Sequence, residues 1–210
     1  MSAMPPGGDL TALAGLVVDR TIALSAIPAP PRHEEQRAYI VLSWWRYDGL
    51  AGVATDAAGN VRARLRAGQP DGAAPRPAVL VCAHLDTVFG PDVRHGTQRR
   101  GARLAGPGVA DNTVAVCALS ALDALLPHDL RHPVWIVATA GEEGLGNLAG
   151  VRALLADPPG PVRAFIALEG DYLGRVTVTG VGSVRWRVTV TGPGGHAWQD
   201  AGQPSAVHEA

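Results

Sequence analysis

The sequence predicts an α/β fold in which a mostly parallel central sheet is flanked by helices. Three short apolar runs have the length and unbroken hydrophobicity of strands that are buried on both faces. Two segments with apolar residues at helical spacing lie between them along the chain. This alternation is typical of parallel sheets, because each helical crossover returns the chain to the same edge. The runs span residues 79–83, 134–138 and 164–168, and the helical segments span residues 114–126 and 148–155.

The chain before the first apolar run is predicted to form two helices and a hairpin. Residues 10–27 carry apolar side chains at helical spacing and end at a proline-rich loop that cannot continue a helix. Residues 34–47 are predicted to form a second helix, which Gly49 ends. Residues 53–66 alternate in polarity and contain a Gly-Asn turn signal, which indicates two antiparallel strands.

The pattern changes after Asp171. Residues 176–191 alternate small or polar side chains with apolar ones, as antiparallel strands with one exposed face do. We therefore expect a first domain over residues 1–180 and the beginning of a second, α+β domain over residues 181–210.

The composition excludes several classes of protein. Apolar residues make up 47% of the chain and charged residues 18%, which is typical of a globular protein. The net charge of −1 favours neither nucleic acid nor a membrane surface as a partner. Basic runs at 62–66 and 99–103 alternate with small or apolar residues, so we interpret them as solvated strand faces. Cys82 and Cys117 lie in apolar runs and are expected to be buried free thiols.

The sequence also bears on localisation. Residues 1–10 do not show a basic segment followed by an apolar one, which a signal peptide requires. No apolar stretch approaches the ~20 residues of a membrane-spanning helix. We therefore expect a cytoplasmic protein.

Six acidic or imidazole side chains lie where the predicted strands and helices begin or end. In open α/β sheets, ligands bind beyond the carboxyl ends of the strands, so these side chains are expected to converge on one rim. They are His84 and Asp86 after the first run, Glu142 and Glu143 after the second, Glu169 after the third, and Asp111, which follows a glycine-rich turn and opens a helix.

Taken singly, each of these residues has an ordinary structural explanation. His84 with Asp86 can be a surface feature, Glu142 with Glu143 a solvated turn, Asp111 a helix N-cap, and Glu169 a cap or a surface acid. Their regular order along the chain favours a metal site instead. Adjacent carboxylates repel each other unless a cation neutralises them, and one of the two glutamates can bind metal while the other accepts a proton. Asp86 is placed to hold the ring of His84.

Three segments resemble signature blocks of the di-zinc metallopeptidases, the family of glutamate carboxypeptidases, aminoacylases, succinyl-diaminopimelate desuccinylase and tripeptidase T. They span residues 82–88, 106–112 and 139–146. The segment around Glu169 and the Gly194-Gly195-His196 turn follow in the same order. The resemblance runs from about residue 10 to the end, and its motifs are specific in combination. It implies a zinc-peptidase catalytic domain followed by the start of a lid domain.

The resemblance implies which residues hold metal. His84 and Glu169 would bind one zinc ion, Glu143 would bind the other, and Asp111 would bridge the two. Two zinc ions are expected in full-length members. Histidine and carboxylate ligands suit zinc, and cobalt or manganese would also fit them.

The resemblance also implies catalytic roles. Asp86 would orient His84, and Glu142 would be the general base that deprotonates a zinc-bound water. His196 resembles the lid-domain histidine that stabilises the oxyanion in the partner's active site of dimeric members. Without the family, His196 would be interpreted as a turn histidine.

The sequence departs from the family in lacking its last zinc ligand, a histidine from a C-terminal return to the catalytic domain. We therefore expect a fragment with little activity of its own. The expected reaction is hydrolysis of a peptide or amide bond in a small peptide. The alternatives are a deacylase of N-acyl amino acids and a non-catalytic metal-binding remnant. The resemblance allows a homodimer through the lid in a full-length form.

Overall fold

A computed structural model describes residues 9–70, 75–170 and 174–210 of the chain. Contacts divide the chain into two units, Met1–Leu173 and Gly174–Ala210. The start of the chain, on which the expectation about a signal peptide rests, lies largely outside the described residues. Within those residues, no helix is both long enough and apolar enough to cross a membrane.

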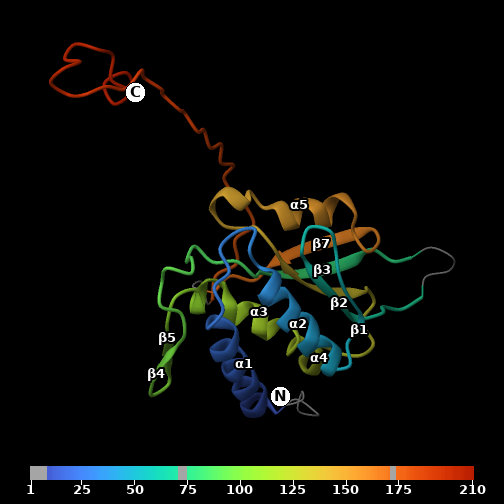
Figure 1. Ribbon diagram of the computed structural model, residues 1–210. Coiled ribbons are helices and arrows are strands. Elements are labelled where there is room, and N and C mark those ends of the chain that lie inside the picture. The colour runs from blue at the N-terminus through green and yellow to red at the C-terminus, as the bar shows by residue number, and fades with distance from the viewer. Residues whose placement is uncertain (1–8, 71–74, 171–173) are drawn as a thin grey trace. The chain divides into compact units, whose positions relative to one another are not determined.

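The helices and strands of the first unit follow the predicted order closely (Figure 1). Asp9 caps the first helix, because its Oδ1 accepts hydrogen bonds from the N–H groups of Thr11 and Ala12. The elements are α1 (Leu10–Ser25), α2 (Glu35–Tyr47), β1 (Ala51–Thr55), β2 (Val61–Arg66), β3 (Ala78–His84), β4 (Gln98–Arg100), β5 (Arg103–Ala105), η1 (Val109–Thr113), α3 (Val114–Leu119), α4 (Leu122–Leu125), β6 (Val134–Thr139), η2 (Gly144–Gly146), α5 (Ala149–Ala156) and β7 (Val162–Ala167).

The five-stranded sheet has the order β1-β2-β6-β3-β7. β3 lies at the junction of two parallel pairs, with β6 on one side and β7 on the other, whereas β2 runs antiparallel to both of its neighbours. The register places His84 opposite Thr139 and Cys82 opposite Ala167. The carboxyl ends of β3, β6 and β7 therefore meet at one edge. The predicted α/β fold with a mostly parallel sheet is confirmed.

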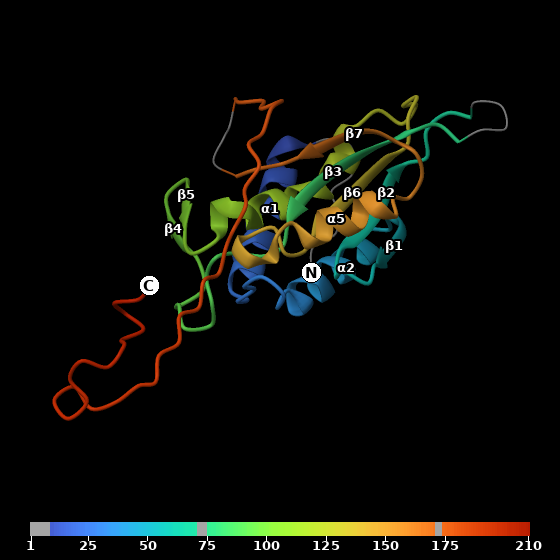
Figure 2. The ribbon, with the colours of Figure 1, turned by 90° about the horizontal axis from the view of Figure 1, so that it is seen from above.

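Helices cover both faces of the sheet (Figures 1 and 2). α1, α2 and α3 pack against one face, where Leu24, Trp45 and Val116 join side chains of the strands in the larger core. α5 covers the other face, where Leu154 packs with Leu80 and other strand residues in a smaller core. Both faces of β3 are therefore buried, which explains the continuous apolar run in the sequence.

One helix differs from its prediction. The segment expected as a single helix over residues 114–126 is divided into α3 and α4. Between them the hydrogen bonds change to the tighter pattern that spans three residues. The N–H groups of Ala121 and Asp123 donate to the carbonyl groups of Ala118 and Ser120. Ser120 is buried there, and its Oγ accepts a 3.0 Å hydrogen bond from Arg20.

The basic runs at 62–66 and 99–103 form solvated strand faces as expected, except at Arg66. Arg99, Arg100 and Arg103 are exposed on the β4–β5 hairpin, as expected. Arg66 at the end of β2 is buried instead. It forms an ion pair with Asp123 and donates to main-chain carbonyl groups near the end of α4. The positive charge of Arg66 is therefore satisfied internally, a possibility that alternation along a strand does not reveal.

The second unit contains turns, and its residues 174–210 form neither helix nor strand. The antiparallel strands expected over 176–191 are therefore not present. Alternating side chains favour strands only where partner strands and an apolar layer are available to pack against, and an isolated hairpin is marginal in water. The domain boundary expected at residue 180 stays a prediction.

Candidate metal centre

The candidate site lies at the edge where the parallel strands end. His84 is the last residue of β3, and the chain continues from it to Asp86. β6 ends beside it at Thr139 and leads to Glu142 and Glu143. β7 ends at Ala167 and leads to Glu169. Adjacent parallel strands thus deliver these side chains to one rim, as the sequence predicts.

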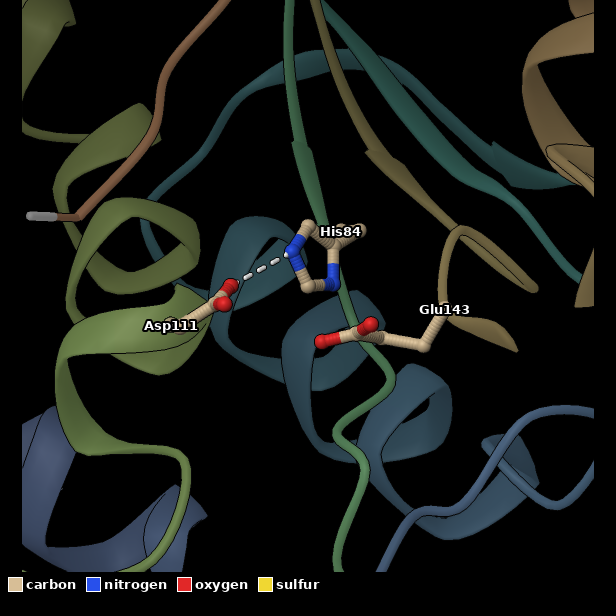
Figure 3. Close-up of side chains that lie close together, drawn as sticks. All are labelled: His84, Asp111 and Glu143. Carbon is tan, nitrogen blue, oxygen red and sulfur yellow. Dashed lines mark hydrogen bonds and ion pairs between the residues drawn. The ribbon is translucent and has the colours of Figure 1, made fainter. Parts of the chain in front are cut away.

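Three side chains approach one another closely enough to share a metal ion. One donor atom each of His84, Asp111 and Glu143 lies within 4.8 Å of the other two. Figure 3 shows the carboxylate of Asp111 to the left of the His84 ring and that of Glu143 below it. His84 is 3% exposed, whereas Asp111 is 61% exposed. The cluster therefore has a fixed inner ligand and an open outer side.

Glu169 lies at the margin of this cluster. Its Oε2 is 3.8 Å from Nε2 of His84. The loop that carries it packs closely on η1, because Nδ2 of Asn112 donates a 2.8 Å hydrogen bond to the carbonyl oxygen of Leu168. A Cβ atom on Gly170 would lie only 1.3 Å from the carbonyl oxygen of Ala110. The glycine thus permits the contact that brings Glu169 toward the cluster.

Asp111 sits at an irregular part of η1. It has extended dihedral angles (φ −112°, ψ 96°), and its peptide bond to Asn112 is cis. Its Oδ1 lies 2.9 Å from Nε2 of His84. The sequence-based alternative for Asp111 was an N-cap, but η1 begins two residues earlier, and its N-cap position is Gly108. Asp111 thus directs its carboxylate to the imidazole.

The ring of His84 is held between oxygen atoms. Its Nδ1 lies 2.9 Å from the main-chain carbonyl oxygen of Asp86 and 3.6 Å from that residue's carboxylate. A carbonyl oxygen only accepts hydrogen bonds, so Nδ1 carries a proton and Nε2 faces Asp111. Asp86 thus contacts His84 mainly through its main chain. Its carboxylate accepts hydrogen bonds from the N–H groups of Glu142 and Glu143.

The electrostatics of the cluster favour a cation. Burial lowers the pKa of His84, but hydrogen bonding to Asp86 and the charges of Asp86, Glu169 and Glu142 outweigh it and raise the pKa to about 9. Burial and the charge of Asp111 raise the pKa of Glu143. Burial also raises the pKa of Glu169, and neighbouring carboxylates add to that effect against the attraction of His84. The carboxylates thus repel one another, and the donor set fits a divalent metal ion that would neutralise them.

Glu142 contributes its charge to this group. It raises the pKa of both Glu143 and Glu169, so its carboxylate lies within electrostatic reach of the cluster. Its main chain is fixed by the 3.0 Å hydrogen bond to Asp86. Glu142 thus adds negative charge to the cluster without being one of the three clustered donors.

His196 belongs to the second unit, so its role stays a prediction. Its contacts are local: its N–H donates a 2.7 Å hydrogen bond to Oδ2 of Asp200. Its Nδ1 accepts hydrogen bonds from the N–H groups of Trp198 and Gln199. The histidine thus organises the turn that contains it.

Comparison with known proteins identifies the family. Residues 60–178, more than half of the chain, match the family model described as Peptidase family M28. The chain belongs to peptidase family M28. The matched range includes His84, Asp111, Glu143 and Glu169, and the resemblance to metallopeptidases is confirmed. No curated protein matches this M28 chain in sequence.

Solved structures share the fold of this M28 chain at low sequence identity. Aminopeptidase PepT from Bacillus cereus matches 75% of the chain at 19% identity, with a TM-score of 0.56. The YXEP protein of Bacillus subtilis, described as a dinuclear metal-binding peptidase, matches 76% at 16% identity, with a TM-score of 0.55. An aminopeptidase from the archaeon Desulfurococcus kamchatkensis matches 77% at 15% identity, with a TM-score of 0.54. The M28 chain spans 44% of each of the first two proteins and 66% of the third.

A buried guanidinium, that of Arg37, lies close to the site and was not predicted from the sequence. Arg37 of α2 is 1% exposed and donates hydrogen bonds to the carbonyl oxygens of Ile27 and Leu85 and to Oγ1 of Thr113. It therefore ties the loop before α2 to the chain after His84 and to the end of η1. A signal was available in the sequence, because Arg37 lies four residues before Val41 on the apolar stripe of its helix.

Proposed function

We propose that this chain carries the metal centre of a zinc-dependent peptidase that hydrolyses a peptide or amide bond in a small peptide. The observation that carries the proposal is the convergence of His84, Asp111 and Glu143 at the carboxyl ends of parallel strands, with donor atoms within 4.8 Å. Membership of peptidase family M28 supports the class of reaction. The description of the Bacillus subtilis YXEP protein as a dinuclear metal-binding peptidase supports the use of two metal ions.

The donor set suits two zinc ions that share Asp111. His84 and Glu169 would hold one ion and Glu143 the other, and zinc accepts both imidazole and carboxylate ligands. When bound, zinc supplies Lewis acidity that activates water and polarises a carbonyl group. The exposed side of Asp111 leaves the cluster accessible to a substrate.

Glu142 is the residue that we assign to proton transfer. It immediately precedes Glu143 in the chain, its N–H group is bound by Asp86, and the residue is half-buried rather than enclosed. A carboxylate in that place can accept the proton of the water that attacks the substrate carbonyl and pass it to the leaving amine. Asp86 keeps Glu142 and Glu143 in fixed relation, because one carboxylate binds both of their N–H groups.

A zinc titration tests the metal part of the proposal. The chain is stripped with a chelator and titrated with zinc, and His84→Ala is compared with His128→Ala, which removes an exposed histidine away from the cluster. We expect saturable binding to the wild type and to His128→Ala, and weak binding to His84→Ala. At free zinc 100 times the Kd, the free energy of unfolding should rise by about 2.7 kcal/mol. Equal binding by all three chains would remove the basis of the proposal.

A substrate panel tests the reaction. The zinc-loaded chain is given dipeptides, tripeptides and N-acyl amino acids, and amine release is measured. We expect only slow release from di- or tripeptides, in keeping with the little activity that the sequence leads us to expect. Release from N-acyl amino acids alone would replace the peptidase with the deacylase. Zinc binding without turnover of any amide would leave a metal-binding remnant.

A further inference from the structure

Four successive N–H groups after β6 donate to side-chain oxygen atoms. β6 ends at Thr139, so these groups lie beyond its strand pairing. The acceptors come from three separate parts of the chain, and the segment that they hold contains both Glu142 and Glu143. The bonds run from Ala140 to Asn60 Oδ1 (3.0 Å), from Gly141 to Glu34 Oε1 (2.9 Å), from Glu142 to Asp86 Oδ1 (3.0 Å) and from Glu143 to Asp86 Oδ2 (2.7 Å).

The side chain of Asn60 is held by hydrogen bonds other than the one to this segment. It is 1% exposed at the end of the turn between β1 and β2. Its side-chain nitrogen donates to Oδ2 of Asp56 at 2.7 Å and to the carbonyl oxygen of Gly150 at 2.9 Å, which leaves Oδ1 free to accept from Ala140. A Cβ atom on Gly150 would lie 2.2 Å from that Oδ1. The Asn60 amide therefore fits a close-packed position in which both its nitrogen and its oxygen are used.

Glu34 makes the equivalent contact from the loop before α2. It immediately precedes α2 and is 6% exposed. Its Oε1 accepts hydrogen bonds of 2.9 Å from the N–H groups of both Arg32 and Gly141. One buried carboxylate oxygen thus joins the loop before α2 to the segment after β6.

The segment needs such anchors because glycines flank its two glutamates. Gly141 and Gly144 both have positive φ, 65° and 51°, and glycine itself permits many other conformations. Hydrogen bonds to buried, immobile acceptors select one of these conformations. The carboxylate of Glu143 reaches the cluster with His84 from this fixed main chain.

We infer that Glu34 and Asn60 are positioning residues which, together with Asp86, determine where Glu142 and Glu143 lie. What the two glutamates do there rests on the proposed function, whereas how they are held rests on the hydrogen bonds alone. Neither Glu34 nor Asn60 is among the clustered donors, so both act through the main chain of residues 140–143.

The test compares Glu34→Ala, Glu34→Gln and Asn60→Ala with the control Glu35→Ala, which truncates the exposed neighbour on α2. Amide hydrogen exchange is measured on the metal-free chain, and zinc affinity is measured by competition with a chelator. Glu34→Ala and Asn60→Ala should speed exchange at residues 140–143 and leave β3 unchanged. Their zinc Kd should rise roughly tenfold, as is usual when support for a metal ligand is lost. Glu34→Gln keeps an accepting oxygen and should restore both readouts.

Three results would overturn the inference. The first is wild-type exchange at residues 140–143 in both alanine variants. The second is faster exchange spread over the whole sheet with an unchanged zinc Kd, which is the result of a purely structural role. The third is Glu34→Gln behaving like Glu34→Ala. If the wild type binds no zinc, the proposed function fails, and the exchange measurement still decides whether Glu34 and Asn60 hold the segment.

Discussion

The N–H group of Glu143 donates a 2.7 Å hydrogen bond to Oδ2 of the fully buried Asp86. Burial alone would raise the pKa of Asp86, but the nearby His84 and the hydrogen bonds from the N–H groups of Glu143 and Glu142 outweigh it and lower the pKa below its usual value. Asp86 therefore stays ionised inside the protein. A single buried charge thus connects the end of β3 to the segment after β6.

Replacing Glu142 with glutamine should separate metal binding from catalysis. The Glu142→Gln side chain keeps its shape, and its main-chain hydrogen bond to Asp86 is unaffected. It cannot accept a proton, so kcat on a cleaved peptide should fall roughly 10²- to 10⁴-fold. The zinc Kd should stay at the wild-type value, since Glu142 lies outside the donor set. A variant that keeps full turnover would assign proton transfer to another group.

Gly170→Ala should loosen the metal centre from a distance. Its Cβ atom would overlap the carbonyl oxygen of Ala110, so the loops that carry Asp111 and Glu169 must separate. We expect the zinc Kd to rise roughly tenfold. Gly15→Ala is the matched control, because its Cβ atom would meet nothing within 4 Å on α1. The control should keep its zinc affinity and gain up to about 1 kcal/mol of stability, measured by urea unfolding. Equal zinc affinity in both variants would contradict the prediction.

Arg37→Ala should destabilise the fold strongly. The substitution removes the guanidinium that donates hydrogen bonds to the carbonyl oxygens of Ile27 and Leu85, and these oxygens lose their partner. The loss should be about 3 kcal/mol of the free energy of unfolding, measured by urea denaturation. Arg46→Ala on the same helix removes an exposed arginine and should change stability by less than about 0.5 kcal/mol. Similar losses in the two variants would argue against a special role for Arg37.

The two cysteines should be unreactive in the folded chain. Burial raises the pKa of Cys82 to about 12; burial also raises that of Cys117 to about 12, although Thr21, Arg20 and Arg37 oppose the rise. Ellman's reagent at pH 8 should therefore label both thiols only after unfolding in urea. Fast labelling of native protein would show that a thiol is accessible.

The same thiols should make the fold less stable at alkaline pH. Unfolded thiols ionise near pH 9, whereas the folded ones stay protonated to about pH 12, so the folded state binds more protons in between. Each thiol should lower the free energy of unfolding by about 1 kcal/mol per pH unit above 9. Cys82→Ala should remove the contribution of one thiol from this pH dependence. Urea unfolding measured at several pH values between 8 and 10 tests this.

The sequence predicted the layout of the sheet because buried parallel strands have a distinctive composition. The three apolar runs became β3, β6 and β7 with shifts of one or two residues at their ends. The positions of His84, Glu143 and Glu169 followed, because strand ends in a parallel sheet share an edge.

Contacts between distant segments could not be predicted in this way. The Gly59-Asn60 turn was correctly interpreted as a hairpin turn, yet nothing local shows that Asn60 also binds Ala140. Glu34 likewise resembled the start of a helix. The interruption of the helix at Ser120 and the burial of Arg66 also arise from side chains far away along the chain, Arg20 and Asp123. Periodicity describes each segment by itself and therefore misses such pairs.

The place of β3 between β6 and β7 has a kinetic consequence. The donors of the cluster come from segments that meet only after these parallel pairs have formed, and such pairings between distant segments close slowly. An early folding intermediate that lacks them has no complete site for zinc. Bound zinc should therefore leave the folding rate nearly unchanged and lower the unfolding rate. The ion would stabilise the completed sheet without helping it to form.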